Sequence, residues 1–140
     1  MRILSLDLGI KSLGICVSDP SNIIAIPIEN YIFERGNFLI ALGKVISMVK
    51  EYNIGTILLG HPLRTDGLKS EATEMSEYFF DLLKNKIDNN IKIKLYDERF
   101  STQRGIELLK NKYKDPNKIR ELKDMAAAYT MLIDFLSYNE

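Results

Sequence analysis

The stretch MRILSLDLGIKSLGICVSD, residues 1–19, decides the fold that the rest of the chain builds on. It predicts one strand over residues 2–7 and a second over residues 13–19, because both are rich in residues that suit a pleated, buried surface. Asp7 lies where the first strand ends. We expect Asp7 to be a functional residue whose partners come from later segments of the chain.

The composition is that of a globular protein that needs no disulfide. The chain has 140 residues, 46% of them hydrophobic and 27% charged, and its formal net charge is zero. We therefore expect a single domain over residues 1–140 that does not coat nucleic acid by bulk electrostatics. The one cysteine, Cys16, is predicted to pack in the core and fits a reducing compartment. The sequence shows no signal peptide and no apolar run of about 18 residues, so we expect a cytoplasmic protein without a membrane partner.

Periodicity predicts further strands and helices after residue 19. A run over residues 23–29 is typical of an edge strand, because Pro27 cannot donate to a sheet ladder. The next elements are a helix over 38–49, a buried strand over 56–60 and a helix with Leu68, Ala72, Met75, Phe79 and Leu82 on one face. A strand over 91–95 follows and runs into Asp97 and Glu98. The chain ends with a helix capped by Ser101 or Thr102 and a last helix from Pro116 to Ser137. Right-handed crossovers then predict an α/β protein with a mixed five-stranded sheet and helices on both faces.

Acidic residues stand at the ends of the predicted strands and in the last helix. Asp7 ends the first strand, Asp97 and Glu98 end the fifth, and Asp124 lies in the last helix. Because like charges raise one another's pKa, a cluster of these carboxylates favours a bound divalent cation, and oxygen ligands suit Mg²⁺ or Mn²⁺. Two such ions about 4 Å apart can stabilise an in-line phosphoryl displacement.

Simpler interpretations of these acids stay open. An Asp at a strand end is often a solvated turn residue. Asp124 projects roughly 140° from the centre of the apolar stripe of its predicted helix, as a surface acid would. Glu98 can simply pair with its neighbour Arg99.

Four motifs occur in an order that is specific in combination. They are DLGIKSLGICVSD (7–19), GHPLRTDG (60–67), DERFST (97–102) and DMAAAYTML (124–132). Over nearly the whole chain they resemble the YqgF family, also called RuvX or Holliday-junction-resolvase-like, of pre-16S ribosomal RNA nucleases. The resemblance implies a ribonuclease H-like fold with strand order 3-2-1-4-5 and a metal-dependent nuclease.

The resemblance also implies which acids form the site. By position, Asp7, Glu98 and Asp124 match the catalytic, metal-binding acids of the family. Asp97 ranks fourth, because alternation along a strand points it to the side opposite Glu98.

Two positions depart from the family pattern. His61 stands where the family commonly has leucine, and it is either a general base or a passive loop residue. Gly105 stands where the family tends to have alanine, and a glycine weakens a helix by roughly 0.5–1 kcal/mol. Neither departure touches the three acids.

Basic residues outnumber acids between Arg99 and Lys123. We expect this segment to contact phosphates on either side of the scissile bond, although a solvated surface loop explains the charges equally well. The residues expected to bind nucleic acid are Lys11, Arg64, Arg99, Lys112 and Lys114.

Three functions stay open at this point. The first is processing of the 5′ end of pre-16S ribosomal RNA by a monomer or homodimer, with precursor RNA and the ribosomal subunit as partners. The second is resolution of four-way DNA junctions, which requires a stable dimer. The third is a non-catalytic module that binds nucleic acid or the ribosome. DLGIKSLG, residues 7–14, also resembles the phosphate-binding hairpin of actin-like ATPases and sugar kinases, but one copy cannot form their two-domain cleft.

Overall fold

Alternation along the first strand sends its side chains into two separate cores. A computed structural model of the chain describes residues 1–98 and 101–138, without the side chains of 101–103 and 138. In β1 (Arg2–Leu8), Leu4 and Leu6 enter one core and Ile3 enters the other. Because β1 is buried on both faces, helices have to cover the sheet on both sides.

Five strands form one sheet in the order β3-β2-β1-β4-β5. The fold class and the strand order predicted from the sequence are therefore confirmed. The strands that join β1 are β2 (Ser12–Ser18), β3 (Ala25–Ile32), β4 (Ile54–His61) and β5 (Lys92–Asp97). β2 pairs antiparallel with β1 and β3, whereas β4 pairs parallel with β1 and β5. The C-terminal ends of β1, β4 and β5 thus share one edge of the sheet, and Pro27 lies on the edge strand β3, as predicted.

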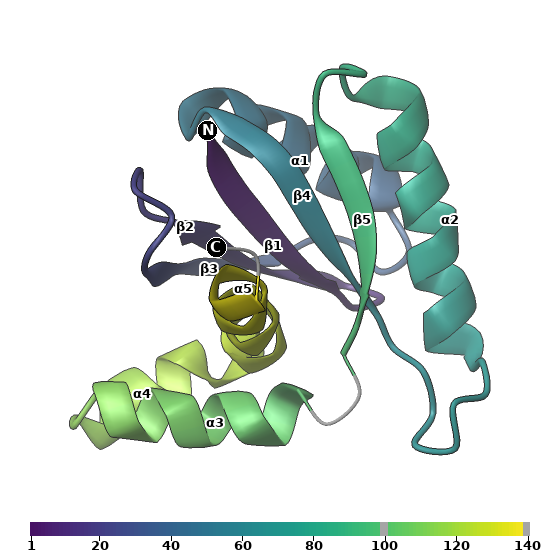
Figure 1. Cartoon of the computed structure of the whole chain (residues 1–140). Coiled ribbons are helices and arrows are strands. Elements are labelled where there is room, and N and C mark those ends of the chain that lie inside the picture. Colours follow the sequence, from purple (N-terminus) through teal and green to yellow (C-terminus); the bar gives the residue numbers. More distant parts are fainter. Residues whose placement is uncertain (99–100, 139–140) are drawn as a thin grey trace.

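Helices flank the sheet on both faces, as Figure 1 shows. The helical elements are α1 (Phe38–Glu51), α2 (Glu71–Lys86), α3 (Ser101–Lys112), α4 (Pro116–Leu122), the 3-10 turn η1 (Lys123–Met125) and α5 (Ala126–Tyr138). α1 and α2 pack on the face that carries Leu4 and Leu6. The segment from α3 to α5 packs on the opposite face, around Cys16 and Leu58.

Local sequence explains where two of the helices begin. The Ser70 hydroxyl accepts from the Thr73 N–H and the Thr73 hydroxyl accepts from the Ser70 N–H, so a capping box starts α2. The Asp115 carboxylate accepts from the Asn117 N–H at 3.0 Å, and Pro116 is the first residue of α4, as predicted. The predicted cap of α3 by Ser101 or Thr102 lies outside the described side chains.

The last helix is not continuous, which the sequence analysis did not predict. The 3-10 turn η1 separates α4 from α5 at Lys123–Met125. The chain turns there because it meets β2 at Gly14, where a Cβ atom would lie only 3.0 Å from the carbonyl oxygen of Asp124. Asp124 is nevertheless exposed, as the projection away from the apolar stripe predicted.

One smaller expectation also fails. Leu68 precedes α2 and is exposed, because the capping box starts the helix after Ser70. By contrast, Cys16 is fully buried, as predicted, and its burial raises the pKa of the thiol.

Among the residues described, we find no helix with the length and hydropathy needed to cross a bilayer.

Candidate active site

Asp7 lies near the C-terminal end of β1 and faces the layer formed by α3 to α5. Alternation places it on the same face as Ser5, whose hydroxyl donates to the carbonyl oxygen of Ala128 in α5 at 2.8 Å. In the antiparallel pair of β1 and β2, Asp7 stands directly opposite Gly14. The carboxylate is largely buried, so it needs a partner that compensates for lost hydration.

Glu98 supplies the second carboxylate from the end of β5. Its backbone N–H donates to the carbonyl oxygen of His61 at 3.4 Å, which extends the pairing of β4 and β5 by one residue. Its side chain lies across Gly60, where an added Cβ atom would come within 2.7 Å of Cδ of Glu98 and closer still to Oε2. Gly60 therefore leaves the space through which Glu98 reaches Asp7.

The two carboxyl groups share a hydrogen bond and perturb each other. Burial, followed by the charge of Asp7 and the hydrogen bond between the two, raises the pKa of Glu98 to about 9. Burial also raises the pKa of Asp7, and the hydrogen bond with Glu98 partly opposes that shift. A protonated Glu98 donating to an ionised Asp7 accounts for both directions.

Asp124 reaches the same region from η1. Its backbone passes over Gly14, and its side chain is exposed. Asp7 and Asp124 border a common hollow of about 440 Å³. The residues that line the hollow are Asp7, Lys11, Ser12, Asn30, Ile32, Lys123, Asp124 and Ala127. The hollow thus brings Asp124 to the side of Asp7 that faces away from Glu98.

The chemistry of this arrangement fits a hard cation. Atom Oε2 of Glu98 is buried and has no hydrogen-bond partner. A buried oxygen without a partner, next to a second carboxylate, is the donor set that a divalent metal ion satisfies. Within residues 1–98 and 101–138, no three acidic, histidine or cysteine side chains already lie close enough together to hold a metal. Asp124 is therefore near the pair and not part of a closed cluster.

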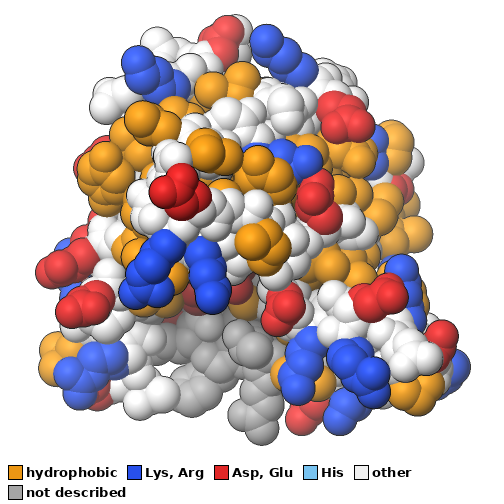
Figure 2. Space-filling view, turned by 180° about the vertical axis from the view of Figure 1, so that it is seen from behind, with side chains coloured by type: hydrophobic (Ala, Val, Ile, Leu, Met, Phe, Trp, Pro, Cys, Tyr) orange, Lys and Arg blue, Asp and Glu red, His pale blue; other side chains and the backbone are white. Residues whose placement is uncertain are grey.

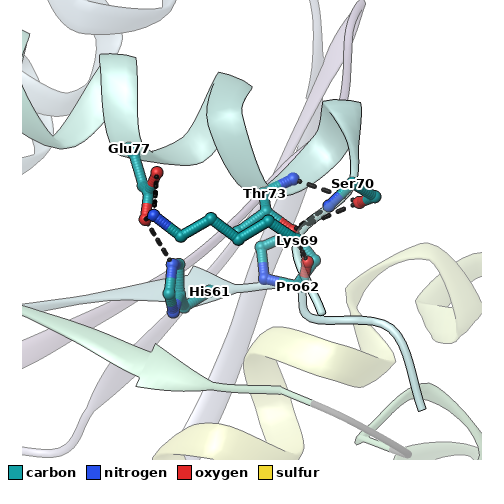
Figure 3. A network of polar contacts seen from close by, with 6 residues as sticks. All are labelled: His61, Pro62, Lys69, Ser70, Thr73 and Glu77. Carbon is teal, nitrogen blue, oxygen red and sulfur yellow. Dashed lines mark hydrogen bonds and ion pairs between the residues drawn. The ribbon is translucent and has the colours of Figure 1, made fainter. Parts of the chain in front are cut away.

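Asp97 and His61 lie toward the opposite face of the sheet. They are neighbours in the register of β4 and β5, and Asp97 is exposed. Nε2 of His61 lies 2.9 Å from Oε2 of Glu77 in α2, and Lys69 also bonds to Glu77 (Figure 3). His61 thus belongs to a network that fastens the loop after β4 to α2.

The same network explains the family motif that begins at Gly60. The Thr73 hydroxyl donates to the carbonyl oxygen of Pro62, next to the capping box (Figure 3). The hydrogen bonds of Lys69 and His61 lower the pKa of Glu77. His61 ends β4, and its hydrogen-bond partner Glu77 lies on α2.

The residues expected to bind nucleic acid are spread over the surface. Lys11 lines the hollow beside Asp7. Arg64 pairs with Asp66 at 3.0 Å in the loop before α2. Lys112 lies at the end of α3 over the rings of Tyr113 and Tyr129. Lys114 follows α3 and is exposed, and Arg99 lies outside the described residues.

Lys112 and Lys114 are remote from the carboxyl pair. α3 begins after Glu98 and runs away from β5 toward the corner that it forms with α4 (Figure 1). Its twelve residues span about 18 Å at 1.5 Å per residue. Figure 2, in which this corner lies at the lower right, shows Lys and Arg side chains gathered there among acidic ones.

The structure explains why position 105 is a glycine, which the sequence alone did not. A Cβ atom there would overlap the carbonyl group of Ala126 and lie against the Thr130 hydroxyl. The glycine therefore lets α3 approach α5 closely, and this packing offsets its low helix propensity.

The fold and the acids define a class of protein before any comparison is made. A sheet in the order β3-β2-β1-β4-β5, with helices on both faces and acids at the ends of β1 and β5, is the ribonuclease H-like fold. A family model described as "RuvX: Holliday junction resolvase" matches residues 1–138, and the chain belongs to this family.

Curated relatives share sequence with this chain over almost its full length. A protein of Mycoplasmopsis pulmonis is 43% identical over 138 residues, which cover 98% of this chain and 93% of the relative. A protein of Sulfurihydrogenibium is 33% identical and covers 99% of this chain and 93% of its own. Both carry the name "Putative pre-16S rRNA nuclease". The chain therefore belongs to a family whose members are named as nucleases, which are enzymes that hydrolyse phosphodiester bonds.

Solved structures extend the likeness at the level of the fold. RuvC of Thermus thermophilus in complex with a Holliday junction substrate has a TM-score of 0.66 at 10% identity, covering 99% of this chain and 96% of that one. The fowlpox virus resolvase in its complex with Holliday junction DNA has a TM-score of 0.57 at 19% identity, covering 98% and 97%.

Two glycines beside Asp7 make room for the other two acids. Gly60 admits the carboxylate of Glu98 from one side, and Gly14 admits the backbone of Asp124 from the other. A glycine inside a strand often indicates close approach of another group, and this signal is present in both β2 and β4.

Proposed function

We propose that this chain is a cytoplasmic, metal-dependent nuclease, folded as one domain over residues 1–140, that processes the 5′ end of pre-16S ribosomal RNA. The observation that carries the proposal is the carboxyl pair of Asp7 and Glu98. The two groups lie together in a buried position, and burial raises the pKa of each. Such a pair is unfavourable for a purely structural protein and useful to one that binds a cation.

Asp7 and Glu98 are the residues that would hold the metal, with Asp124 as a third oxygen donor. Mg²⁺ and Mn²⁺ both suit such a set of carboxylates. When bound, a divalent cation supplies the charge that stabilises the attacking and leaving oxygens of a phosphoryl displacement. All three acids act as catalytic residues in this proposal.

The protein's own contribution is to hold these oxygens in place and to manage one proton. Without a cation, the carboxyl group of Glu98 stays protonated, and its O–H donates a hydrogen bond to Asp7. Loading the site releases that proton, which couples metal affinity to pH. The backbone on both sides of Asp7 is fixed by sheet pairing, so the carboxylates need little reorganisation.

Basic side chains orient the substrate strand in this scheme. Lys11 lines the hollow that Asp7 and Asp124 border. Arg64 and Arg99 belong to the segments that follow β4 and β5, whereas Lys112 and Lys114 would contact phosphates further along the strand.

A second candidate is resolution of four-way DNA junctions. It is favoured by the ribonuclease H-like fold that the chain shares with two proteins solved with Holliday junctions. A resolvase cuts two strands symmetrically, so this candidate requires a stable homodimer. A third candidate, a non-catalytic module that binds nucleic acid or the ribosome, would have no use for the raised pKa of Glu98.

A cleavage assay separates these candidates. Wild type and Asp7→Asn are incubated with precursor 16S RNA or with a four-way DNA junction, each with Mg²⁺, Mn²⁺ or a chelator. We expect metal-dependent cleavage of the RNA at its 5′ side by wild type, and a loss on the order of 100-fold or more in Asp7→Asn. Preferred cleavage of the junction by a dimer would favour the resolvase. Equal cleavage by both proteins, or by neither, would remove the proposed site.

A further inference from the structure

The hollow beside Asp7 is lined by both polar and apolar side chains. Its lining includes the two acids, Asp7 and Asp124. It also includes Ile32, which is 65% exposed although it is large and apolar. Asn30 stands in the sheet row that runs from Asp7 through Gly14, because the register pairs these residues in turn. An exposed isoleucine next to an amide offers a surface to a flat ring with polar edges.

Two lysines from different elements line this hollow. Lys11 comes from the turn between β1 and β2, and Lys123 comes from η1. Both side chains are exposed, and within the described part of the chain neither forms an ion pair. The pair therefore offers positive charge to a ligand phosphate at the rim.

The wall that carries Lys11 is held in place by backbone hydrogen bonds. The Phe33 N–H donates to the carbonyl oxygen of Lys11 at 3.0 Å, and the Gly36 N–H donates to that of Ile10 at 2.8 Å. Within the turn, the Gly9 N–H donates to the carbonyl oxygen of Ser12 at 2.7 Å. A preformed wall lowers the entropy that is lost when a ligand binds.

We infer that this hollow is a subsite for one unpaired nucleotide next to the scissile phosphate, with its base on Ile32 and Asn30 and its phosphate between Lys11 and Lys123. About 440 Å³ lies within the range of small-molecule sites and holds one nucleotide. A base that is stacked and paired in a duplex cannot enter such a hollow without leaving the helix. The inference rests on the proposed nuclease function and narrows its substrate to strands that are unpaired at the cut.

Binding without cleavage tests the subsite separately from catalysis. A labelled single-stranded RNA 12-mer and the same strand in a blunt duplex are titrated with protein in a chelator, and fluorescence anisotropy gives both dissociation constants. We expect the single strand to bind at least about 10-fold more tightly than the duplex. Equal affinities would overturn the inference.

Point variants assign the two parts of the ligand. Ile32→Ser is expected to weaken single-strand binding about 5-fold with an unchanged salt dependence, because it removes stacking area only. Lys11→Ala and Lys123→Ala are each expected to lower the slope of log affinity against log salt by about 0.7. Asn30→Ala is expected to change the preference among the four bases at one position.

Matched controls come from the far side of the molecule. Ile23→Ser alters an isoleucine that is 74% exposed in the turn between β2 and β3, and Lys92→Ala alters an exposed lysine at the start of β5. Both are expected to bind as wild type does. If Ile32→Ser matches Ile23→Ser, the subsite is wrong, whether or not the protein cleaves. If the single strand binds through Ile32 but no metal supports cleavage, the subsite stands and the proposed nuclease function fails.

Discussion

The carboxylate of Glu98 occupies the space that a side chain at Gly60 would fill. A Cβ atom on Gly60 would lie 2.7 Å from Cδ of Glu98, well inside van der Waals contact. Glu98 reaches Asp7 across this gap. Burial, followed by the charge of Asp7, raises the pKa of Glu98 to about 9. Because Gly60 in β4 has no side chain, Glu98 at the end of β5 can join a site centred on Asp7 of β1.

Gly60→Ala is expected to displace Glu98 from Asp7 and to lower the cleavage rate on the order of 100-fold, because small displacements of catalytic groups have effects of that size. The melting temperature should also lose its dependence on added Mg²⁺ or Mn²⁺. Shortening the acid in Gly60→Ala/Glu98→Asp should recover part of both properties, since the shorter side chain clears the new methyl group.

The matched control for Gly60→Ala is Gly43→Ala. A Cβ atom at Gly43, in α1, meets nothing within 4 Å. We expect unchanged cleavage and a gain of about 0.5–1 kcal/mol in the free energy of unfolding. A Gly60→Ala variant that cleaves at the wild-type rate would show that Glu98 does not need its position over Gly60.

Glu98→Gln is expected to change how stability depends on pH in the metal-free protein. The folded protein holds the proton of Glu98 up to about pH 9, whereas the unfolded chain releases it near 4.5. Between these values the folded state binds more protons, so the free energy of unfolding falls as pH rises. Urea denaturation in a chelator across this range should show the fall in wild type and a much smaller one in Glu98→Gln.

Glu121→Gln provides the control for this pH series, because Glu121 is an exposed residue of α4. Its stability should follow the wild-type curve. A wild-type free energy of unfolding that stays flat over the range, or a slope in Glu98→Gln equal to that of wild type, would contradict the shared proton.

Gly105→Ala is expected to destabilise the protein although alanine is the better helix former. The added methyl group would overlap the carbonyl group of Ala126 in α5, and overpacking of this kind costs about 1–3 kcal/mol. Urea denaturation gives the difference, with Gly43→Ala again as the helical control. An increase in stability would mean that α3 can shift away from α5 freely.

His61→Leu is expected to keep the cleavage rate within about 3-fold of wild type. This result would exclude a general-base role for His61, because a general base contributes at least about 100-fold. His61 contacts Glu77 on α2, so the substitution should loosen the loop after β4. Faster proteolysis of that loop would report the loosening, and Glu77→Gln should reproduce it. A pH-rate profile that loses one limb in His61→Leu would restore the general-base hypothesis.

Periodicity and motif order were enough to predict most of the fold. The residue types in residues 2–7 predicted a buried strand, and Pro27 predicted the edge of the sheet; both are confirmed. Local signals also placed the start of α4 at Pro116. These features depend on neighbours in the chain, which is why the sequence carries them.

The break between α4 and α5 could not be predicted in this way. Residues 116–137 read as one continuous amphipathic helix, and nothing local in Lys123–Met125 indicates a turn. The turn forms where η1 approaches β2 at Gly14, about 110 residues earlier in the chain. The only trace of such a long-range contact in the local sequence is a glycine within a strand.

By itself the sequence determined the order of strands and helices, the edge strand that carries Pro27 and the three acids that stand as candidates. The tertiary structure decided how those acids meet. It placed Glu98 against Asp7 across Gly60, brought Asp124 in over Gly14 on the other side, and turned His61 toward α2. The reason is physical: alternation and helix periodicity fix which way a side chain points, but only packing between elements fixes which gaps are left for another side chain to fill.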